Sequence, residues 1–121
     1  MLSRLVSEFA AEIANHDWSD APYRLDRAGH RRCDDSPSKQ TVQLSPEETD
    51  SIRTNVMWVV AQVLKHSDPN LDLHEFAEAC GVPRRITHRT DGSLSDAITF
   101  GLRWQEVRVV AEDPLADRHS E

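Results

Sequence analysis

Hydrophobic positions recur at helical spacing at the start of the chain. Residues 2–14 carry a narrow apolar stripe made of Leu2, Leu5, Val6, Phe9 and Ile13. Positions three and four apart share one face of an α-helix, so this pattern predicts an amphipathic helix within residues 1–16. Its polar face carries one cation, Arg4, too few for a helix that lies on a membrane surface. We expect the stripe to pack against a core or a second copy.

The helical periodicity disappears between residues 17 and 43. This segment is rich in Asp, Pro, Gly and Ser, which favour turns and interrupt helices. Trp18 and Tyr23 are unusual in a solvated loop, because aromatic side chains are stabilised by burial. We therefore predict an irregular segment, called the strap below, part of which crosses the core.

A second helix has a well-marked start and is predicted over residues 45–66. Ser45 is an N-cap, Pro46 suits the first helical position and Glu48 completes a capping box. Its broad apolar face should form the centre of the core, with Met57 at the border; this face consists of Ile52, Val56, Val59, Val60, Val63 and Leu64. Trp58 falls on the opposite side, where it is either buried under another segment or exposed to a partner.

Residues 72–110 predict a short helix, a turn and then a strand. Asp72 and Glu75 start the helix, and Gly81 closes it. Apolar and polar residues alternate from Ile98 to Trp104, which is typical of a strand. A helix remains an alternative over residues 94–104, because apolar side chains there also share one helical face. Residues 111–121 are expected to form a flexible acidic tail.

The length of 121 residues fits one domain, residues 1–121. The predicted class is α+β, mainly α, with a small helical core, a helix-turn-helix-like segment and a C-terminal strand or hairpin. The longest apolar run, residues 56–61, is too short to span a bilayer, and the N-terminus lacks a secretory pattern. We expect a cytoplasmic protein without a membrane partner, in which Cys33 and Cys80 are reduced thiols.

Charge limits the kinds of partner that this chain can bind. The net charge of -7 opposes broad binding to nucleic acid, which is driven by many cations displacing counterions from phosphates. Net positive charge is confined to residues 21–44 and 79–110. Any contact with DNA must therefore be local.

The residues LHEFAEACGVP, 73–83, have the pattern of the first half of a helix-turn-helix, with a small alanine four positions before the turn glycine. Over residues 72–90 the chain resembles the MerR-like and excisionase-like families. In those families a branched apolar residue follows the turn glycine by six positions, whereas here Ile86 follows by five and Thr87 takes the family position. The resemblance implies that the following cationic residues contact duplex DNA, namely Arg84, Arg85, His88 and Arg89.

An ordinary core explains the same segment equally simply. Phe76, Ala77, Cys80 and Val82 are typical buried residues, and the arginines have many carboxylates nearby with which to form weak surface ion pairs. The sequence leaves the DNA-contact and core interpretations open.

Metal and catalytic chemistry are not indicated by the motifs. His30 and Cys33 are three apart, and Cys80 with His74 or His88 is the nearest approach to a zinc ligand set, but only one close pair exists. No nucleophile, phosphate-loop or zinc-protease motif occurs. We therefore expect no metal, no cofactor and no enzymatic activity.

Two stretches, DWSDAPYRLDRAGH at 17–30 and LSPEE at 44–48, resemble small accessory proteins of mycobacterial and other actinobacterial phages or prophages. The resemblance implies a regulator or a host-directed binder. The first hypothesis is a DNA-binding regulator that acts as a homodimer. The second is a protein-interaction module without nucleic-acid contact, which uses Trp18, Tyr23 and Trp58.

Overall fold

The structure is a computed structural model that describes residues 1–39 and 42–103. Helix α1 spans Arg4–Asn15, and α2 spans Pro46–Ser67. Three short helices follow, α3 at Leu73–Ala79, α4 at Arg84–Thr87 and α5 at Ala97–Phe100. Two single 3₁₀ turns, Arg32–Asp34 and Pro37–Lys39, interrupt the strap. The described part of the chain is mainly helical.

Side chains that cap the helices define where they begin. Ser3 accepts a hydrogen bond from the Val6 N–H at the start of α1. At the start of α2, Ser45 and Glu48 form the reciprocal capping box that the sequence predicts. The Asp72 carboxylate accepts from the Glu75 N–H and begins α3. Each cap satisfies a backbone donor that has no partner within the helix.

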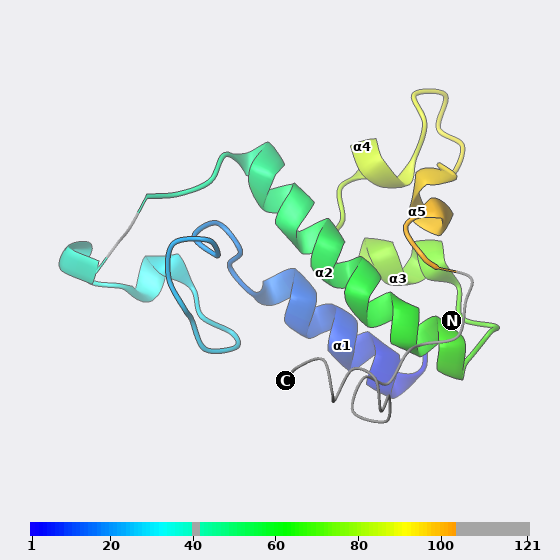
Figure 1. The fold of residues 1–121 in the computed structure, drawn as a ribbon, viewed down its shortest axis with the longest axis horizontal. Helices are drawn as coiled ribbons and strands as arrows, with labels where there is room; N and C mark the ends of the chain where they lie inside the picture. The colour runs from blue at the N-terminus through cyan, green and yellow to red at the C-terminus, as the bar shows by residue number, and fades with distance from the viewer. Residues whose placement is uncertain (40–41, 104–121) are drawn as a thin grey trace, which may run out of the picture.

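The two long helices run antiparallel and side by side, and α3 packs against both (Figure 1). The largest core side chains, Phe76, Met57 and Ile98, are fully buried at their junction. The α4 and α5 segments pack on α3 and on each other. The strap extends from the end of α1 to one side of this helical body (Figure 1).

The buried face of α2 differs from the predicted one. Its buried residues are Thr54, Met57 and Ala61, whereas Val59 is 72% exposed and Val63 51% exposed. Burial of Thr54 leaves no polar group unsatisfied, because its hydroxyl donates to the Asp50 carbonyl oxygen at 2.7 Å. A valine-rich face therefore lies at the edge of the core rather than at its centre.

The first helix and the C-terminal segment also depart from the predictions. In α1 the buried residues are Val6, Ala10 and Ile13, while Leu5 and Phe9 of the predicted stripe remain exposed. The strand expected from Ile98 is wrong over residues 98–100, which belong to α5, so the helical alternative holds there. Ile98 is fully buried against α3, and this contact selects the helix. Residues 104–121, with the rest of the predicted strand and tail, lie outside the described residues.

The turn after α3 needs its glycine, because Gly81 has φ of +86°. After α4, a single antiparallel bridge joins His88 to Leu94 and closes a hairpin. None of the helices within residues 1–39 and 42–103 combines the length and the apolar character that crossing a bilayer requires.

Candidate functional site

The strap is held at its two ends by polar contacts. Asp17 accepts hydrogen bonds from the Ser19 hydroxyl at 2.6 Å and from the Arg32 backbone N–H at 3.0 Å. The Trp18 indole donates to the Ile13 carbonyl oxygen at 2.9 Å and so fixes the strap to α1. Near α2, the Leu44 N–H donates to the Ser19 carbonyl oxygen at 2.7 Å. These contacts bring residues 17, 19, 32 and 44 together.

Burial alone would raise the pKa of Asp17, but the hydrogen bonds from Ser19 and Arg32 outweigh it and hold the pKa below its ordinary value. The ionised form of Asp17 therefore stabilises the closed strap.

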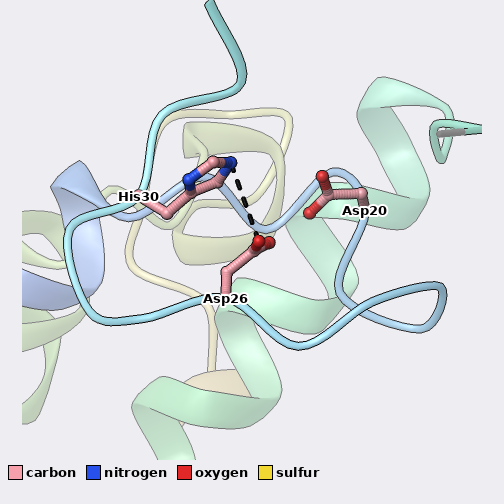
Figure 2. Close-up of side chains that lie close together, drawn as sticks. All are labelled: Asp20, Asp26 and His30. Carbon is pink, nitrogen blue, oxygen red and sulfur yellow. Dashed lines mark ion pairs between the residues drawn. The ribbon is translucent and has the colours of Figure 1, made fainter. Parts of the chain in front are cut away.

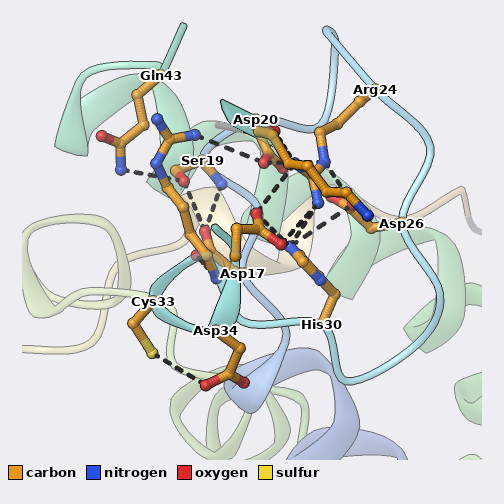
Figure 3. A network of polar contacts seen from close by, with 12 residues as sticks. Asp17, Ser19, Asp20, Arg24, Asp26, His30, Cys33, Asp34 and Gln43 are labelled. Atoms are coloured by element: carbon orange, nitrogen blue, oxygen red, sulfur yellow. Dashed lines mark hydrogen bonds and ion pairs between the residues drawn. The ribbon is translucent and has the colours of Figure 1, made fainter. Parts of the chain in front are cut away.

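The Arg24 side chain belongs to the network of polar contacts in the strap that Figure 3 shows. Its Nε donates to Asp26 at 2.7 Å, and its terminal nitrogens bond the Lys39 carbonyl oxygen at 2.7 Å and His30 Nε2 at 2.8 Å. An ion pair of 3.0 Å joins it to Asp35. One guanidinium thus connects four points along the strap. Its carboxylate partners Asp26 and Asp35 raise its pKa.

Asp20 is the least satisfied member of this network. Its side chain is fully buried, and neither carboxylate oxygen has a hydrogen-bond partner. The nearest cations are Arg24 at 3.5 Å and Arg32 at 3.6 Å. Burial and the adjacent Asp26 carboxylate raise the pKa of Asp20. For Asp26, burial opposes ionisation, but the hydrogen bond from Arg24 lowers its pKa overall.

The same network leaves apolar side chains facing solvent. Tyr23 and Leu25 lie on either side of Arg24 and are 49% and 100% exposed, and Pro22 is exposed as well. Arg24 bonds within the network, while its two neighbours are exposed. Exposed Arg27 and Arg31 line a hollow beside this surface, together with Ala28, Gly29, His30, Asp34 and Asp35.

The predicted DNA-contact residues lie on α4 and on the hairpin that follows it in the sequence. Arg84, Arg85 and Arg89 are exposed, but the His88 side chain is only 10% exposed. The predicted second helix is a single turn of four residues. Thr87, at the position where the resembled families carry an apolar anchor, is almost fully buried.

Acidic side chains accompany two of these arginines. Arg85 lies 3.3 Å from Asp50 of α2, and Arg89 lies 2.8 Å from Asp96. Exposed pairs of this kind add little stability, but each carboxylate cancels charge that a phosphate would meet. The cationic surface is therefore weaker than the sequence suggests.

The predicted partner-binding residues separate into two kinds. Trp18 and Trp58 are half-buried, and each indole N–H donates to a backbone carbonyl oxygen, of Ile13 and of Ile98 respectively. Both indoles therefore connect segments of the chain to one another. Tyr23 alone of the three is exposed.

The two cysteines that the sequence offers as zinc ligands, Cys33 and Cys80, lie in different parts of the structure. Cys80 is buried in the hydrophobic core, while Cys33 is exposed on the strap and contacts Asp34. Within residues 1–39 and 42–103, the group with metal-binding geometry is instead Asp20, Asp26 and His30.

Sequence reasoning missed Arg24 and its acidic partners. One signal was available, since Asp, Arg and His recur at close spacing from Asp17 to Asp35. Such density in a segment without helical period indicates a polar network rather than a solvated loop. The path of the backbone decides which carboxylate pairs with which cation. A periodic pattern in the sequence does not describe that path.

Comparison with known proteins gives no significant match to a protein-family model, a curated protein or a solved structure. The function must therefore be inferred from the chemistry of the site.

Proposed function

We propose that this protein is a non-enzymatic protein-interaction module whose binding surface is the part of the strap around Arg24. The observation that carries the proposal is the outward display of Tyr23 and Leu25 on a backbone fixed by the Arg24 contacts. A pre-ordered loop loses less conformational entropy on binding than a mobile one. Aromatic and aliphatic side chains presented in this way are typical anchors of protein interfaces.

The charge around these anchors defines the kind of partner. Arg27 and Arg31 are exposed beside them, and residues 21–44 have a net positive charge. We expect the partner to have an apolar pocket with an acidic rim. Complementary charge at the rim would speed association, while the buried anchors would supply most of the affinity.

The test is a photo-crosslinking amino acid placed at Leu25, with a second placed at exposed Leu94 on the hairpin as the matched control. The proposal expects one discrete partner at position 25 and none at position 94. With that partner purified, Leu25→Ala and Tyr23→Ala should each weaken binding by about tenfold or more. Equal crosslinking at both positions, or unchanged affinity in both variants, would contradict the proposal.

DNA binding is the second candidate function, and the placement of three exposed arginines favours it. Arg84, Arg85 and Arg89 are exposed on the one-turn helix and hairpin that follow a helix and a glycine turn. This candidate expects duplex binding that weakens steeply with salt and is reduced by Arg84→Ala with Arg85→Ala, while exposed Arg4→Ala has little effect. We rank it second because Asp50 and Asp96 already pair with two of the arginines.

A further inference from the structure

We propose that Asp20, Asp26 and His30 bind a divalent transition-metal ion in the position that the Arg24 guanidinium occupies. Figure 2 shows the carboxylates of Asp20 and Asp26 pointing toward one another, with the His30 ring beside them. The three candidate ligand atoms lie within 4.8 Å of one another. In a tetrahedral site, ligands about 2.1 Å from the metal ion are about 3.4 Å apart, so these atoms would move closer together when they bind an ion.

The Asp20 carboxylate is buried and has no direct hydrogen bond. A buried carboxylate is expected to be hydrogen-bonded or to coordinate an ion. Asp20 has no exposed surface and no hydrogen bond to either oxygen, and its two guanidinium neighbours lie at 3.5 and 3.6 Å. A metal ion bound directly to this carboxylate would satisfy it.

Carboxylates outnumber guanidiniums in this network; the groups are Asp17, Asp20, Asp26 and Asp35 with Arg24 and Arg32. A metal ion bound between Asp20 and Asp26 would relieve the repulsion between these two adjacent carboxyl groups.

The guanidinium of Arg24 marks the place of the ion. It meets all three candidate ligands, with Nε 2.7 Å from Asp26 and 3.5 Å from Asp20, and a terminal nitrogen 2.8 Å from His30 Nε2. A guanidinium only donates hydrogen bonds, so Nε2 accepts with the lone pair that a metal ion would bind. The Arg24 side chain is 20% exposed and so already reaches solvent.

The donor set selects the class of metal. One imidazole nitrogen with two carboxylate oxygens suits zinc and other first-row transition metals, whereas Ca²⁺ and Mg²⁺ prefer oxygen ligands alone. With three protein ligands, a tetrahedral ion would keep one position for water or for a group from a partner.

The experiment is a titration of the metal-free full chain with Co²⁺ and with Zn²⁺, followed by visible absorption and by competition with a chromophoric chelator. The proposal expects one ion per chain. Asp20→Asn and His30→Gln should each weaken binding by about tenfold or more, because each removes a ligand. Arg24→Gln should tighten binding by about tenfold, because it removes the competing cation. Exposed His66→Gln is the matched control and should bind as the natural chain does.

Two results would overturn the proposal. One is Zn²⁺ affinity unchanged in both Asp20→Asn and His30→Gln, which would place the ion on other histidines. The other is no binding at millimolar Zn²⁺ by either the natural chain or Arg24→Gln. Should a variant fail to fold, the natural chain decides the question, since bound Zn²⁺ must shift the ring ¹⁵N resonances of His30 and an unchanged His30 ring rejects the site.

Discussion

Gly101 is a position where a single methyl group has no room. Its φ of -74° is ordinary, but a Cβ at this residue would overlap the indole of Trp58. That indole is fixed by its hydrogen bond to the Ile98 carbonyl oxygen, at 3.0 Å. The glycine is therefore required by close packing and not by backbone conformation.

Gly101→Ala should lower the free energy of unfolding by about 1–3 kcal/mol, the usual cost of overpacking. Urea denaturation of the variant and the natural chain measures the difference. Gly29→Ala is not a suitable control, because Gly29 has positive φ. Exposed Ala97→Gly at the start of α5 changes one methyl group without a clash and serves as the reference, with an expected loss of only about 0.5–1 kcal/mol, the usual cost of a helical glycine. Equal stability of Gly101→Ala and the natural chain would show that the indole moves freely.

The two cysteines differ in environment and should differ in reactivity. Burial raises the pKa of the Cys80 thiol to about 12, whereas Cys33 is exposed. The thiolate is the reactive form, so iodoacetamide at pH 8 should label Cys33 in the native protein and leave Cys80 unmodified. Mass spectrometry of the labelled chain checks this. In denaturant both should react, and native labelling of Cys80 would mean that the core opens readily.

At the scale of elements, polar contacts between charged side chains stabilise the strap. Its contacts are ion pairs and hydrogen bonds around Arg24 and Asp17, while the helices α1, α2 and α3 share an apolar core. We expect conditions that alter ionisation to affect the strap before the helices.

Acid should therefore open the strap. The pKa of Asp17 is lower in the folded chain than in the unfolded chain, so its ionised form stabilises the fold at pH above about 4, the ordinary Asp value. That contribution is lost as the pH falls through the lowered value. Asp20 acts in the opposite sense, because its pKa is raised and its neutral form is favoured.

Amide hydrogen exchange of the Ser19 and Arg32 N–H groups, which donate to Asp17, reports the opening. Protection of these groups should fall as the pH drops below about 4, while that of Phe76 in α3 persists. In Asp17→Asn the two N–H groups should already be less protected at pH 7. Simultaneous loss at all three residues would show that the strap and helices form one cooperative unit.

At the scale of the whole molecule, the seven-residue helix α3 is the element against which the other helices pack. It contacts α1, α2, α4 and α5, and its Phe76 is the largest fully buried side chain. Loss of this one ring should therefore affect every helix.

Phe76→Ala should destabilise the fold by about 3–5 kcal/mol, since it removes apolar contacts and leaves a cavity. Thermal unfolding followed by circular dichroism measures the change, and Phe76→Leu should retain much of the lost stability. A drop confined to residues 73–100, with α1 and α2 still folded, would contradict the central role of α3.

The sequence by itself determined the local features of this protein. Helix starts follow from side chains within three or four positions, so the limits of α1 and α2 and the capping box at Ser45 were predicted well. The helix from Asp72 and its end at Gly81 depend on equally local chemistry. Such features need no knowledge of distant residues.

Only the tertiary structure decided which faces are buried and which charges meet. Thr54 is buried and Val59 is exposed although the two side chains are nearly equal in size, because the packing of α1 and α3 on α2 decides which face of that helix is covered. Arg24 meets His30 and Asp35 because the strap folds back on itself, and Arg85 meets Asp50 across 35 positions of sequence. Contacts between distant residues depend on the whole backbone path, and periodicity in the sequence contains no information about that path.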